Sequence, residues 1–163
     1  MHHESELSRD TIIRLKIAGD DLRFSVIENS GAGEGKSVSV GSITPIRSIL
    51  RHEPVTAAEL EAVIAEVEDL IMPVIRTLPS GGVLEVAGHE LCEVAEALPS
   101  LGMEPTPIEA VEHLFNRLAN VATGSPAGSQ GVPVTTSFAL GLVVLREVMH
   151  HGGYHSVLRY PNH

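Results

Sequence analysis

The sequence predicts an α/β domain built around a mixed β-sheet. Apolar and polar residues alternate over most of residues 11–29 and again over 36–42, which is typical of strands, whereas helical periodicity dominates after residue 56. The chain has 163 residues, 43% of them hydrophobic, which is enough for one domain with its own core. We therefore expect an N-terminal tail over residues 1–10 and a single domain over residues 11–160.

The first two predicted strands form a hairpin. Their apolar positions are Ile13, Leu15 and Ile17 in the first strand and Leu22, Phe24 and Val26 in the second. The link Ala18-Gly19-Asp20-Asp21 predicts a turn, because Gly and Asp tolerate left-handed backbone conformations. A third strand over residues 36–42 completes an antiparallel meander.

Helices and one buried strand follow the meander. Thr44-Pro45 predicts the start of a short helix that ends near Pro54. A capping box over residues 56–59 begins the longest helix, whose apolar stripe reaches Leu78. Residues 83–87 predict a buried strand parallel to the first, and residues 89–98 a further helix.

The last third of the chain continues the pattern. A second capping-box pattern over residues 106–109 predicts a helix through Leu118, and residues 123–133 predict a mobile loop. Residues 137–149 are apolar almost all round, which indicates a buried helix, and residues 154–160 predict the last strand. This order is that of a ribonuclease H-like layer: a mixed five-stranded sheet with antiparallel strands 1–3 and helices on its faces.

Composition excludes several classes of partner. The formal net charge of −10 has the wrong sign for a protein that binds a phosphate backbone, so we expect no nucleic-acid partner. Cys92 is the only cysteine, which excludes an intrachain disulfide and favours a reducing, cytoplasmic location. Neither a signal peptide nor an apolar span of about 18 residues is present, so we expect a soluble chain without a membrane partner.

Four motifs suggest chemistry but favour structural interpretations. Residues 30–37 resemble a P-loop, yet Val38-Ser39-Val40 predicts a strand where a P-loop needs a helix, so a hairpin loop is favoured. Asp20 and Asp21 are adjacent turn residues, whose side chains usually point apart, and Cys92 lies among apolar residues that predict a buried position. An acidic run on the longest helix predicts a solvated surface; it comprises Glu59, Glu61, Glu66, Glu68 and Asp69.

The histidines near the C-terminus are the remaining candidates for metal ligands. His150, His151 and His155 offer imidazoles, but the first two lack helical i, i+4 spacing and no carboxylate lies among the three. An exposed cluster without a role is therefore the favoured interpretation, with metal binding as an open alternative.

The ordered segments resemble the second actin-like domain of the exopolyphosphatase and guanosine pentaphosphate phosphohydrolase family, Ppx/GppA, over roughly residues 11–159. Residues 16–21 stand where that family has a D-x-G-G-G-S/T phosphate loop, and residues 87–91 stand where it has a G-G-T-type second loop. The segments 114–119, 139–149 and 154–159 resemble a later helix, the buried helix and the closing strand.

The resemblance implies a phosphate site and also its loss. The family-equivalent phosphate-binding positions are Gly19, Asp20, Asp21, Gly88 and His89. Asp20 and Asp21 replace Gly and Ser/Thr, so carboxylates that repel phosphate stand where the family has donors. The family's first actin-like domain, which completes the cleft, is not expected in this chain, and half a cleft does not exclude water from a phosphoryl-transfer site.

We therefore expect an exopolyphosphatase-related module that binds or regulates without catalysis, with no catalytic residue, metal or cofactor. Its expected partners are a second copy of the chain or another protein, and a phosphate-containing small molecule. The alternative is a phosphatase acting on polyphosphate, guanosine pentaphosphate or a nucleotide, with a cleft completed by a second chain. In that case Asp20 or Asp21 would hold Mg²⁺.

Overall fold

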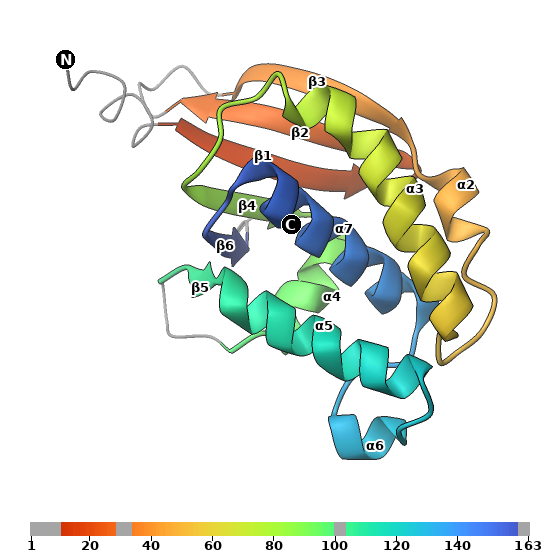
Figure 1. The fold of residues 1–163 in the computed structure, drawn as a ribbon. Helices are drawn as coiled ribbons and strands as arrows, with labels where there is room; N and C mark the ends of the chain where they lie inside the picture. The colour runs from red at the N-terminus through yellow and green to blue at the C-terminus, as the bar shows by residue number, and fades with distance from the viewer. Residues whose placement is uncertain (1–10, 29–33, 100–103, 160–163) are drawn as a thin grey trace.

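The computed structural model describes residues 11–28, 34–99 and 104–159. Its centre is a six-stranded sheet with the strand order β3-β2-β1-β4-β6-β5 (Figure 1). The strands are β1 (Thr11–Ala18), β2 (Asp21–Glu28), β3 (Glu34–Ser42), β4 (Val83–Ala87), β5 (Thr106–Pro107) and β6 (Ser156–Arg159). The predicted antiparallel meander of β1, β2 and β3 is confirmed, and so is the parallel pairing of β4 with β1.

The sixth strand, β5, was not predicted. It has only two residues, too few for a visible alternation, and it pairs antiparallel with β6. The predicted capping box at residues 106–109 is wrong, because Thr106 lies in β5 and its hydroxyl donates to the carbonyl oxygen of Pro99 at 3.1 Å. The following helix instead has Pro107 as its N-cap, without a side-chain cap.

Six helices lie among the described residues. They are α2 (Thr44–Arg47), α3 (Ala57–Ile75), α4 (His89–Ala97), α5 (Ile108–Ala122), α6 (Ala127–Gln130) and α7 (Thr136–Gly152). Two predictions need correction. The helix after Pro45 ends at Arg47, well before Pro54, and the segment predicted as a mobile loop, residues 123–133, contains the short helix α6. None of the described helices combines the length and apolar character needed to cross a bilayer.

The capping box that begins α3 is confirmed. The backbone N–H of Glu59 donates to the Thr56 hydroxyl at 3.1 Å, and the backbone N–H of Thr56 donates to Glu59 Oε1 at 3.1 Å. Glu59 Oε2 also accepts from the backbone N–H of Arg51 at 3.0 Å and lies 2.7 Å from His52 Nδ1. Burial raises the pKa of the Glu59 carboxyl, but hydrogen bonds from His52, Thr56 and Arg51 outweigh it and lower the pKa to about 2.

The core is organised around α7, whose apolar residues are buried almost all round. The helix packs against α3, α4 and α5 (Figure 1). Gly141 allows α4 to approach closely, because a Cβ atom there would lie 2.5 Å from the carbonyl oxygen of Glu90. At the end of α7 a Cβ at Gly152 would lie 2.2 Å from the Tyr154 ring. Burial raises the pKa of the Tyr154 hydroxyl to about 12, and this hydroxyl donates to Pro79 O at 3.2 Å.

A second close approach fixes the end of β4 against β1. Gly88 follows β4 with a φ of +97°, and a Cβ atom there would lie 2.3 Å from the carbonyl oxygen of Ile17. Only glycine avoids both the backbone strain and the collision. The structure therefore requires Gly88 for packing, independently of any ligand.

We expect Gly88→Ala to lower the free energy of unfolding by about 3 kcal/mol or more, because the added methyl group forces β1 and β4 apart. Gly82→Ala is the matched control. Gly82 has a similar φ of +86° but nothing within 4 Å of its Cβ position, so that variant should lose only about 1–2 kcal/mol through strain. Urea unfolding followed by circular dichroism measures both. Equal losses would contradict the close approach of Gly88 to Ile17.

Candidate functional site

The turns that carry the predicted phosphate positions lie side by side. Lys16 pairs with Ala87 across β1 and β4, so the turn after each strand begins at the same edge of the sheet. The first turn is shorter than predicted, because β1 reaches Ala18 and β2 begins at Asp21. Gly19, with a φ of +61°, supplies the left-handed conformation that this tight turn requires. The two turns therefore form one candidate site.

The Arg47 guanidinium lies between the two turns. Its Nη2 donates to the Gly19 carbonyl oxygen at 2.8 Å, and its Nη1 forms an ion pair with Glu90 in the first turn of α4. Its Nε lies 3.7 Å from Asp20 Oδ1. Arg47 lies there because the start of α2 is bound to the first turn. The backbone N–H of Ile43, the N-cap of α2, donates to the Asp20 carbonyl oxygen at 2.7 Å. The site therefore already contains a cation bound by protein oxygens.

Glu90 makes the charge of this region unfavourable for phosphate. Its side chain is 9% exposed, so its carboxylate depends on Arg47 for compensation. Two carboxylates and a carbonyl oxygen thus surround one guanidinium, whereas a phosphate loop presents donors to an anion. The side chains provide acceptors where the resemblance implies donors.

Asp20 and Asp21 do not form a paired-carboxylate site. Asp20 points toward Arg47, whereas Asp21 Oδ1 accepts from the Ser39 hydroxyl at 2.6 Å and its Oδ2 lies 3.2 Å from Arg23 Nε. The prediction that their side chains diverge is confirmed.

His89 begins α4 and lies at the rim of the candidate site. Its side chain is 80% exposed, and Nε2 lies 3.3 Å from Glu93 Oε1, one helical turn further on. Glu93 Oε1 also accepts from the Ser137 hydroxyl at 2.8 Å, which ties the start of α7 to α4. The structure therefore directs His89 to a carboxylate and not to the gap that Arg47 fills.

A small open pocket adjoins Arg47. It holds about 90 Å³ and is lined by Arg47, Leu50, Thr136, Ser137 and Leu140. Small-molecule sites usually hold roughly 300 Å³ or more, so this pocket is too small for a nucleotide.

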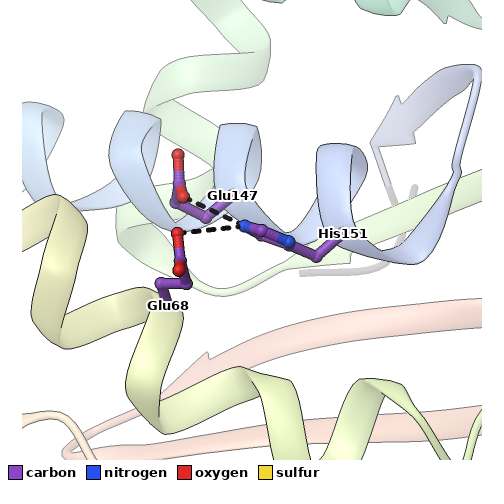
Figure 2. Close-up of side chains that lie close together, drawn as sticks. All are labelled: Glu68, Glu147 and His151. Atoms are coloured by element: carbon purple, nitrogen blue, oxygen red, sulfur yellow. Dashed lines mark ion pairs between the residues drawn. The ribbon is translucent and has the colours of Figure 1, made fainter.

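A second polar cluster involves one of the predicted histidines. His151 Nε2 lies 3.3 Å from Glu68 Oε2 and 3.4 Å from Glu147 Oε1 (Figure 2). His150 pairs with Glu112 instead, and His155 is exposed just before β6. No carboxylate lies among these histidines in the sequence, but the structure brings two to His151: Glu147 precedes it by one helical turn, and the fold adds Glu68 from α3.

Two further predictions have clear outcomes. Lys36 and Ser37 of the P-loop-like segment lie in β3, so the helix that a P-loop needs is missing there, while residues 29–33 lie outside the described part of the chain. Cys92 is only partly buried, which corrects its predicted place in the core.

Sequence reasoning missed Arg47, Glu90 and Glu147. Arg47 and Glu90 carry no local motif, and only the tertiary structure brings them together. Glu147 and His151 had a visible signal, because their i, i+4 spacing places both on one face of a helix.

The fold matches solved structures of a known family. The chain is similar to the Aquifex aeolicus PPX-GPPA enzyme, with a TM-score of 0.63 and 9% identity, over 91% of this chain and 52% of that one. It is also similar to an exopolyphosphatase from Cytophaga hutchinsonii, with a TM-score of 0.59 and 10% identity, over 91% of this chain and 52% of that one. An exopolyphosphatase-like protein matches with a TM-score of 0.59 and 12% identity, over 91% of this chain and 54% of that one.

These likenesses show that the chain has the actin-like fold of Ppx/GppA proteins, as the resemblance implied, and that it spans about half the length of each structure. No protein-family model and no curated protein matches the sequence. The comparisons therefore show the fold, and the function has to be argued from the site.

We expect Arg47→Ala to lower the free energy of unfolding by about 1.5–3 kcal/mol, because it leaves the buried Glu90 carboxylate without its partner. The double variant Arg47→Ala/Glu90→Gln should lose less free energy of unfolding than the sum of the two single variants, since it leaves no unpaired buried charge. Denaturant unfolding of all three variants measures this coupling. Arg51→Ala, at an exposed position, is the control and should change stability by less than about 0.5 kcal/mol. Additive losses at residues 47 and 90 would contradict the proposed dependence.

Proposed function

We propose that this chain is a non-catalytic binding or regulatory module built on the Ppx/GppA fold. The observation that carries the proposal is the position of Arg47, which donates to the Gly19 carbonyl oxygen at 2.8 Å and pairs with Glu90 between the two turns. A phosphate in that gap would have to displace Glu90 from Arg47 and leave a buried carboxylate without compensation. The folded chain thus stabilises a closed, self-paired site.

Among the described residues, the same region does not present free donors and cations to a phosphoryl group, because Arg47 is bound to protein oxygens. Catalysis of phosphoryl transfer depends on donors and cations placed around the transferred group and on a site closed to water. Here Asp20 lies near Arg47 and Asp21 pairs with Ser39 and Arg23, so each carboxylate already has a partner other than a metal ion. These contacts support the non-catalytic interpretation over the phosphatase alternative.

The proposed ligand is a phosphate-containing small molecule, as the family resemblance implies, that binds beside the gap between the turns and not within it. The adjoining pocket is lined by Thr136 and Ser137, but the Ser137 hydroxyl donates to Glu93 and the charge of Arg47 is offset by Glu90, so the pocket favours a weakly held group. The volume of about 90 Å³ supports a small group over a bound nucleotide. The proposal places the module in the cytoplasm, which suits a chain whose only cysteine is Cys92.

The proposal also includes self-association. The similar solved structures are about twice as long as the part that matches this chain. A second copy or another protein would supply a facing wall where those structures have further chain, and closed symmetric dimers are the commonest such assembly.

We expect the purified chain with Mg²⁺ to release no more phosphate than a buffer blank from polyphosphate, guanosine pentaphosphate or a nucleoside triphosphate, because Arg47 and Glu90 occupy the gap between the turns. Asp20→Ala and Asp21→Ala should give the same result as the unchanged chain. A colorimetric phosphate assay beside an active exopolyphosphatase measures this. Release that Asp20→Ala or Asp21→Ala abolishes would overturn the proposal and establish the phosphatase alternative.

We expect gel filtration with light scattering at micromolar concentration to give a mass of about twice the 17.4 kDa of one chain. Dilution should shift the mass toward one chain, since self-association follows mass action. A mass of one chain throughout the micromolar range would contradict the homodimer. The proposed partner would then have to be a different protein.

A further inference from the structure

The cluster of Glu68, Glu147 and His151 lies where α3 meets the last turns of α7 (Figure 2). Glu147 and His151 are one helical turn apart on α7, and Glu68 faces them from α3. One donor atom from each residue lies within 4.8 Å of the other two. Figure 2 shows both carboxylates directed toward the imidazole. The cluster is separate from the site at Arg47, because it involves neither α2 nor the turns after β1 and β4.

The distances in the cluster suit an ion better than direct hydrogen bonds. His151 Nε2 lies 3.3 Å from Glu68 Oε2 and 3.4 Å from Glu147 Oε1, whereas N–H···O hydrogen bonds usually span about 2.7–3.2 Å. Two ligands at about 2.0–2.2 Å from a tetrahedral Zn²⁺ are separated by roughly 3.3–3.5 Å. Two ligands at right angles around Mg²⁺ are separated by only about 2.9 Å. The two distances from His151 Nε2 match the tetrahedral geometry, and the ligand oxygens of Glu68 and Glu147 lie within 4.8 Å of each other.

We propose that Glu68, Glu147 and His151 form a binding site for a divalent transition-metal ion, with Zn²⁺ as the best fit. The imidazole favours such ions over Mg²⁺ and Ca²⁺, which prefer sites made of oxygen alone. Three protein ligands leave a fourth position for water. The Glu68 side chain is 48% exposed, so it can move to bring its carboxylate oxygen closer to that of Glu147.

The surroundings of Glu147 support this assignment. Its side chain is 5% exposed, and its Oε2 accepts from Arg146 Nη1 at 3.0 Å. Arg146 is itself held by Glu112 at 3.2 Å and by the Phe115 ring, whose centroid lies 4.2 Å away. One carboxylate oxygen of Glu147 is therefore fixed by a rigid partner, and the other is directed toward His151. Such outer contacts orient metal ligands.

The local charge also favours a divalent cation. Glu68, Glu112 and Glu147 bring three negative charges against the single positive charge of Arg146. These four side chains have a net charge of −2, which a divalent ion neutralises. The bound ion would join α3 to α7, and so strengthen the contact between two main helices of the core.

The test uses the full chain with His2→Ala and His3→Ala, which removes two histidines that also offer zinc ligands. Isothermal titration with Zn²⁺ should give one ion per chain. A melting curve with Zn²⁺ about a hundredfold above its dissociation constant should show a rise in Tm of roughly 5–10 °C, because the ion binds only the folded state. Mg²⁺ at the same concentration should give no rise. Absence of stoichiometric Zn²⁺ binding would overturn the site.

Variants assign the ligands. His151→Ala should weaken Zn²⁺ binding by about 100-fold or more, and Glu68→Gln, at an exposed position, should weaken it by at least about tenfold without endangering the fold. His155→Ala is the matched control and should leave the Zn²⁺ affinity unchanged, because His155 lies outside the cluster and its Arg146 and Glu112 contacts. Loss of binding in His155→Ala, or unchanged binding in His151→Ala, would contradict the proposed ligand set. Because activity is not the readout, the result is independent of the function proposed for the Arg47 site.

Discussion

The burial of α7 is the constraint on which the rest of the structure depends. A helix that is apolar almost all round must be enclosed, and here α3, α4 and α5 pack against it beside the sheet. Enclosure requires close contact, so Gly141 lets the Glu90 backbone approach to a distance that any side chain would block. That contact places the first turn of α4, and with it Glu90, within reach of Arg47.

The polar side chains at both ends of α7 follow from the same enclosure. At its start, Ser137 donates to Glu93 and lines the pocket beside Arg47. Near its end, Glu147 is buried with the rest of the helix and needs compensation, which Arg146 provides at one oxygen. A charged residue on a buried helix is costly unless its neighbours satisfy it. Both polar regions are therefore attached to the buried helix at the centre of the core.

Much of the fold could be predicted because its signals are local. Strand alternation gave the meander, and the Thr56–Glu59 box gave the start of α3, since both depend on residues close in sequence. The features that the sequence did not predict either are too short to show a period or depend on contacts between residues that are not neighbours in sequence. β5 is too short for any period, and the role of Thr106 depends on a contact with Pro99. The Arg47–Glu90 pair joins residues far apart in sequence, so the closed state of the candidate site was beyond sequence reasoning.

The glycines explain why the fold does not depend on phosphate binding at the two turns. Gly19 is required by the left-handed conformation of its turn, and Gly88 by the approach of the Ile17 carbonyl oxygen. Both requirements hold whether or not phosphate binds, so a chain that lost the ligand would still need these residues to fold. The chemistry of the turns depends on the side chains next to these glycines, and here Asp20 and Glu90 face a guanidinium of the same chain. Fold and function are thus carried by different residues of the same turns.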